Sequence, residues 1–172
     1  MAMSASICLQ TLALPQATPP QTTADADAKV AAIMDDALRR GERHPEGKAD
    51  VMISTWVPPS ADDVQRIREI GHDAIAPLTK ALDPPYRRPF QRILAVRLLG
   101  EIGGPDVVPS LKRALLPDNP NSVRIEALAA LISVPKDMAL PIFRETLHDS
   151  DPVVAGRAKE LLTGYYQIDV PE

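Results

Sequence analysis

Apolar residues recur every three or four positions along most of the chain, which is the spacing of an amphipathic helix. The first such stripe consists of Val30, Ile33, Met34, Ala37 and Leu38. It predicts a helix over about residues 25–40, which Thr23 or Asp25 can cap and Gly41 can end. Because a single stripe cannot be buried by the helix that carries it, this helix needs a neighbour.

From Ser60 onward, a block of residues returns after 32 positions. The two copies are Val64, Ile67, Glu69, Ile70 and Gly71, and then Val96, Leu99, Glu101, Ile102 and Gly103. Each glycine stands where a helix should stop. A period of this length is typical of stacked helical hairpins, each of which needs its neighbours to bury its apolar stripe.

Turns that contain Pro or Asp separate the remaining segments, and no segment shows the alternation typical of a strand. The pattern predicts seven further helices, over about residues 61–70, 73–82, 89–102, 106–116, 121–133, 137–148 and 152–163. We therefore expect a repeat domain over residues 60–165. Residues 25–59 would form a capping helix and loop, and residues 166–172 a C-terminal tail.

Two of the predicted helices resemble the second helix of a HEAT repeat. Residues 122–131 read SVRIEALAAL, and residues 93–103 read ILAVRLLGEIG. The resemblance covers about residues 60–163 and is to the short-repeat branch that includes the phycobilisome-lyase type. It implies an all-α, right-handed solenoid of stacked antiparallel hairpins, whose second helices line a concave binding surface. It implies no particular ligand, because this fold serves adaptors, assembly factors and lyase subunits alike.

In that family, a turn Asp and an Arg six positions later often form a ladder between repeats. Asp118 and Arg124 match this spacing. Asp83 lies nine residues before Arg92, and Ala155 stands at the corresponding position after Asp149. The spacing therefore supports one Asp–Arg contact of this kind, and it does not support a continuous ladder.

Residues 1–24 allow two interpretations. A mildly apolar stretch over residues 7–14 precedes small residues, as at the end of a secretory signal, but no Lys or Arg comes before Lys29. The segment is either a disordered Pro/Thr/Gln tail or the remnant of a signal peptide. The protein would be cytoplasmic in the first case, and periplasmic or secreted in the second.

Composition limits the classes of function. Apolar residues make up 45% of the sequence and aromatic residues 3%, so the core must consist of Leu, Ile, Val and Ala. The net charge of −4 disfavours nucleic acid as a partner. No segment has the ~20 apolar residues of a membrane span. The single cysteine, Cys8, cannot form an internal disulfide.

Catalytic motifs are not visible. His44, His72 and His148 are dispersed and have no partner at metal-ligand spacing. Asp149 and Asp151 lack the glycine and closing glutamate of a calcium loop. We therefore expect no catalytic residue, cofactor or metal, and a protein that is not an enzyme.

Four arginines within eleven residues, Arg87, Arg88, Arg92 and Arg97, are the most distinctive charged feature. We expect Arg88, Arg92, Arg97, Arg124 and Glu126 to form the region that contacts a partner. Arginine forks suit carboxylates, so the expected ligand is an acidic segment of a protein. The alternative is a solvated surface that Glu101, Glu126 and Asp118 offset.

These features predict a non-enzymatic scaffold or adaptor that mediates protein–protein interaction. The alternative is a lyase-like or chaperone subunit that assists modification or assembly of a partner protein. Trp56 either covers the end of the helical core or is an exposed anchor for the partner.

Overall fold

A computed structural model of the chain describes residues 23–42, 59–83 and 89–170. The segment before residue 23 lies outside these ranges. So do Cys8, His44, Trp56, Arg87 and Arg88, and the expectations for these five residues stay predictions.

Each regular element of the described residues is helical, as the periodicity predicts. The α-helices are α1 (Thr23–Glu42), α2 (Ala61–Ile70), α3 (Ile75–Lys80), α4 (Pro89–Ile102), α5 (Val108–Ala114), α6 (Asn121–Ala130), α7 (Lys136–Thr146) and α8 (Pro152–Glu160). Short 3₁₀ turns precede α3 and α5 and follow α6, and one π turn follows α8. None of these helices has the length and apolarity that a membrane span requires.

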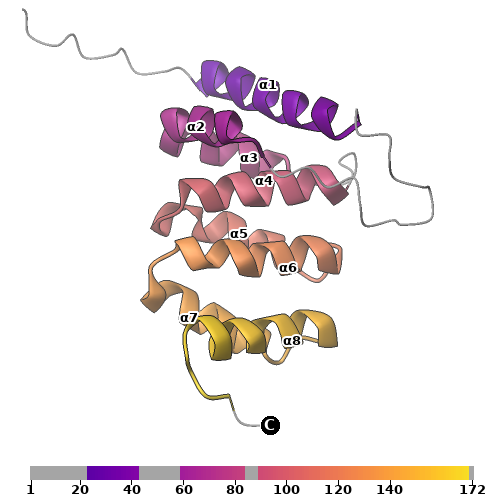
Figure 1. Cartoon of the computed structure of the whole chain (residues 1–172), viewed down its shortest axis with the longest axis vertical. Helices are drawn as coiled ribbons and strands as arrows, with labels where there is room; N and C mark the ends of the chain where they lie inside the picture. The colour runs from indigo at the N-terminus through magenta and orange to yellow at the C-terminus, as the bar shows by residue number, and fades with distance from the viewer. Residues whose placement is uncertain (1–22, 43–58, 84–88, 171–172) are drawn as a thin grey trace, which may run out of the picture.

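The helices stack in pairs along one long axis (Figure 1). We call α2, α4, α6 and α8 the second helices, because each follows its partner within a pair. Successive second helices contact one another along the stack, from α2 through α4 and α6 to α8. In the view of Figure 1, α3, α5 and α7 lie behind them. The helix α1 covers the first end of the stack and contacts α2, α3 and α4.

A continuous aliphatic core runs through the stack. The helix α4 contributes most to it, with Leu94, Ala95, Val96, Leu98 and Leu99 buried. Leu128 on α6 and Leu131 directly after it continue the core, and Phe143 continues it on α7. The core thus consists mainly of Leu, Ile, Val and Ala, as the scarcity of aromatic residues predicts, with Met34 and Phe143 as additions.

Local sequence signals determine where the helices begin and end. Ser60 and Asp63 form a capping box at the start of α2, and the Asp151 carboxylate accepts from the first backbone N–H groups of α8. Gly71 and Gly103 follow α2 and α4 with φ of 63° and 65°, a conformation that favours glycine. Both glycines therefore end helices, as the repeat predicts.

Residues 166–170 belong to the segment that the sequence assigns to a C-terminal tail, and they pack against the core. Tyr166, Ile168 and Val170 are partly buried against the core. The Ile168 N–H donates to the Leu162 carbonyl oxygen at 2.9 Å, and the ring of Tyr166 lies 5.5 Å from that of Phe143. Burial, followed by the neighbouring Tyr165, raises the pKa of Tyr166. This segment covers part of the last pair.

We predict that Leu131→Ala lowers the free energy of unfolding by ~2–5 kcal/mol, because Leu131 is fully buried and its truncation leaves a cavity. Leu116→Ala is the matched control, since the Leu116 side chain is 50% exposed. Urea denaturation of the two variants measures the difference. Similar losses in both would show that the core does not pass through Leu131.

Candidate functional site

The structure separates the arginines and the glutamate that the sequence assigns to one contact region. Arg92 and Arg124 reach into the turns between helices, whereas Arg97 and Glu126 lie on the outer side of α4 and α6. Arg88 lies outside the described residues. The described members therefore form two groups with different surroundings.

Arg124 lies inside the stack. Its side chain is 6% exposed, its Nε donates to the Leu115 carbonyl oxygen at 2.9 Å, and its Nη2 donates to the Asp149 carboxylate. The expectation that Arg124 pairs with Asp118 is wrong, because the carboxylate within its reach belongs to the following turn. A guanidinium bound in this way holds α6 to two turns and is not presented to a partner.

Arg92 makes the equivalent link one repeat earlier. Its Nη1 donates to the Asn119 Oδ1 at 3.1 Å, and the Asn119 Nδ2 donates to the Arg113 carbonyl oxygen at 3.0 Å. Arg92 and Arg124 thus each run from a second helix to the turn of the next pair. Both arginines therefore make a contact between repeats. The partner in each case lies in the turn of the next pair, and not six residues before the arginine as expected.

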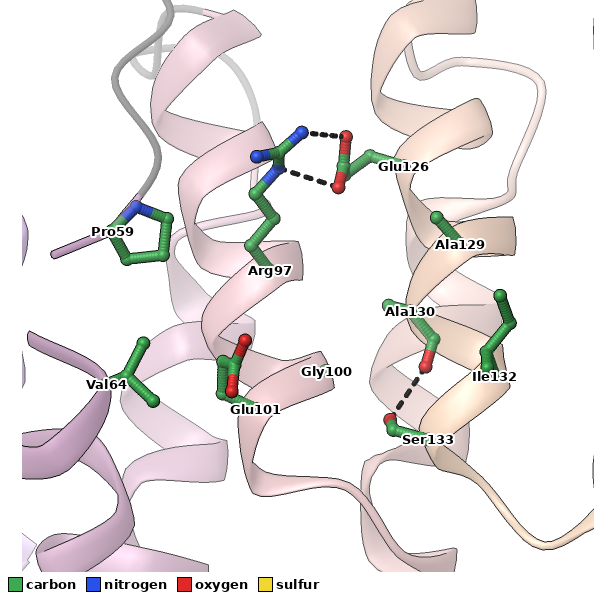
Figure 2. Close-up of a pocket in the computed structure, with 10 residues that line it drawn as sticks. All are labelled: Pro59, Val64, Arg97, Gly100, Glu101, Glu126, Ala129, Ala130, Ile132 and Ser133. Atoms are coloured by element: carbon green, nitrogen blue, oxygen red, sulfur yellow. Dashed lines mark hydrogen bonds and ion pairs between the residues drawn. The ribbon is translucent and has the colours of Figure 1, made fainter. Parts of the chain in front are cut away.

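A groove of about 500 Å³ lies across the second helices α2, α4 and α6 (Figure 2). Its apolar floor consists of Val64, Gly100, Ala129, Ala130 and Ile132. Pro59 and Ser133 also line it. Three consecutive second helices therefore contribute to one hollow, and each apolar residue of the floor is partly exposed.

A bidentate ion pair joins two of the helices beside this floor. The Arg97 Nε lies 2.6 Å from the Glu126 Oε1, and the Arg97 Nη2 donates to the Glu126 Oε2 at 2.7 Å (Figure 2). The two side chains are 25% and 20% exposed. Because the guanidinium fork matches the carboxylate, this pair fixes the position of α4 relative to α6.

A second charge pair lies nearby. Glu101 also lines the groove, and its Oε2 accepts from the Arg68 Nη2 of α2 at 2.9 Å. The Arg68 side chain is 59% exposed, so solvent weakens this pair. The rim of the groove thus carries one firm ion pair and one weak one.

Two of the three histidines, His72 and His148, lie in the part of the chain that the structure describes. No group of three His, Cys, Asp or Glu side chains there converges in a way that could hold a metal ion. His72 lies at the surface with its Nδ1 3.3 Å from the Asp106 carboxylate, and His148 is exposed at the end of α7.

Stacked helix pairs that share one core and line a groove with their second helices define an α-solenoid repeat protein. Residues 75–163 match the family model for HEAT repeats, a span of just over half of the sequence. The chain therefore belongs to the HEAT-repeat family.

One relative is deoxyhypusine hydroxylase of Eremothecium gossypii, to which the chain is 37% identical over 102 residues. The aligned region is 58% of this chain and 31% of that protein, so the chain spans about a third of the length of this relative. No solved structure matches the chain significantly.

We predict that Arg124→Gln lowers the free energy of unfolding by ~3–5 kcal/mol, because it leaves the Asp149 carboxylate buried without its cation. Arg68→Gln breaks an exposed pair and should lower it by less than ~1 kcal/mol. Urea denaturation at neutral pH compares the two variants. A small loss for Arg124→Gln would place this arginine at the surface instead of inside the stack.

Proposed function

We propose that the chain is a non-enzymatic scaffold or adaptor that binds another protein in the groove across α2, α4 and α6. The observation that carries this proposal is the groove whose apolar floor is contributed by three consecutive second helices and is partly exposed to solvent. Repeat proteins of this architecture use such extended surfaces for binding. An apolar hollow with a few fixed polar groups provides both contact area and orientation.

The rigidity of the groove supports the same role. Its walls are helices, and the Arg97–Glu126 pair ties two of them together. A surface that is already ordered before binding loses less conformational entropy when a partner arrives. The groove is therefore suited to receive a segment of a partner protein.

Hydroxylation is not part of this proposal. The activity in the name of the relative belongs to that protein, and the alignment covers 31% of its length. Helical repeats serve many unrelated functions, so a partial alignment of this kind does not carry the activity over to this chain.

A lyase-like or chaperone subunit is the alternative that the resemblance to short repeats of the phycobilisome-lyase type supports. Such a subunit would also hold a partner protein on its second helices, so the groove serves both hypotheses. The two hypotheses differ in what the protein would carry. A subunit that handles a prosthetic group would copurify with that group and would therefore absorb visible light.

We predict that a photo-crosslinking amino acid at position 129 forms an adduct with a partner protein in cells that naturally contain this chain. Ala129 lines the groove, and the same amino acid at the exposed Ala76 of α3 is the matched control. Denaturing gels and mass spectrometry of the purified full chain detect the adducts. The proposal is wrong if position 129 gives no adduct, or gives the same adducts as position 76.

A further inference from the structure

We propose that the groove binds a short apolar segment that carries a lysine or arginine, contributed by a partner protein. This inference rests on the proposed function, because it names the chemistry of the partner that the groove accepts. It follows from the apolar floor and from the charges that line the groove.

The floor determines the apolar part of the partner. Val64 of α2, Ala129 of α6 and Ile132, which follows α6, are each partly exposed. Apolar side chains of a partner that contact these residues remove both surfaces from water, which is favourable in proportion to the area buried. Val64 lies on one side of α4, and Ala129 and Ile132 lie on the other (Figure 2), so a short segment that crosses α4 can contact both parts of the floor.

The charges determine the polar part. Arg97, Glu101 and Glu126 are the charged residues that line the groove within the described chain. Arg97 and Glu126 neutralise each other through a bidentate pair, and a partner would have to disrupt this pair to use either residue. The remaining charge is the Glu101 carboxylate, so the lining carries a net charge of about −1.

Glu101 can accept a new cation readily. Its carboxylate is held by Arg68, which does not line the groove and whose side chain is 59% exposed. Exposed pairs of this kind contribute little, so a cation from the partner can share or replace Arg68 without a large loss. A lysine or arginine next to the apolar residue therefore complements Glu101.

An acidic segment, the ligand expected from the arginine cluster, fits this geometry less well. Arg124 is buried against Asp149, and Arg92 is bound to Asn119. An acidic segment in the groove would meet the Glu101 carboxylate, because Arg97 is already bound to Glu126. Binding of acidic peptides is therefore an alternative result that the following experiment can detect.

The experiment presents the purified full chain to a phage-displayed library of random nonapeptides. We expect the enriched peptides to combine a large apolar residue with a neighbouring Lys or Arg. A synthetic peptide of the enriched sequence should bind Ala129→Phe at least about tenfold more weakly, because the added ring fills the hollow. Ala76→Phe adds the same ring to the outer surface of α3 and should bind normally.

Two further variants test the role of Glu101. Glu101→Gln should weaken binding of the same peptide about three- to tenfold and reduce its dependence on salt, because an attractive charge is lost. Arg68→Gln breaks the same ion pair but keeps the carboxylate, so it should bind at least as tightly as the natural chain. Circular dichroism checks that each variant is folded.

Three results would overturn the inference: enrichment of acidic peptides, absence of any enriched peptide, or binding unchanged by Ala129→Phe. If Glu101→Gln and Arg68→Gln weakened peptide binding equally, the inference that the partner segment carries a basic residue would be wrong. Failure of the proposed function is a separate result, since it appears as the absence of a specific adduct at position 129. An adduct at position 129 together with enrichment of acidic peptides would support protein binding in the groove and would contradict a basic, apolar partner segment.

Discussion

Close packing of α4 against α6 is the constraint on which the rest of the structure depends. A Cβ atom at Gly100 would lie 3.1 Å from the Ala130 Cβ, so a larger residue at position 100 would require Ala130 to move by a few tenths of an ångström. The Gly104 N–H then donates to the Ser133 carbonyl oxygen at 3.2 Å. This approach brings Arg97 within reach of Glu126 and places Gly100 and Ala130 side by side on the floor of the groove.

The turns add a second set of connections behind this contact. Arg92 and Arg124 each cross from a second helix to the turn of the next pair, and Arg113 pairs with Asp83 of the preceding turn. At the first end, Arg40 of α1 donates to Asp63, whose carboxylate is fully buried. Each repeat is therefore held to its neighbour by both apolar and charged contacts, as expected for a stack whose members do not fold alone.

The hydrophobic period was sufficient to predict the helices and much of the core. The 32-residue repeat placed Val96 and Leu99 on the apolar stripe of a helix and Gly71 and Gly103 at helix ends, and the structure confirms all four positions. These features are local, because the spacing of apolar residues determines which side of a helix is buried.

The partners of the arginines could not be predicted in the same way. Arg92 and Arg124 bind residues 27 and 25 positions away, and the separation varies because the turns differ in length. Arg92 and Arg97 are five residues apart on one helix and so point about 140° away from each other, although the charge run suggests one surface. The groove depends on the relative placement of three helices, which no single repeat specifies.

The central claim is that the repeats form one cooperative stack joined through α4 and α6. Native-state hydrogen exchange of the full chain tests it most directly, by comparing the opening free energies of amides in α4 and α6. We predict that the slowest amides of both helices share one opening free energy, equal to that of global unfolding. A clearly lower value for either helix would show that it opens independently, and would contradict a stack held together at this contact.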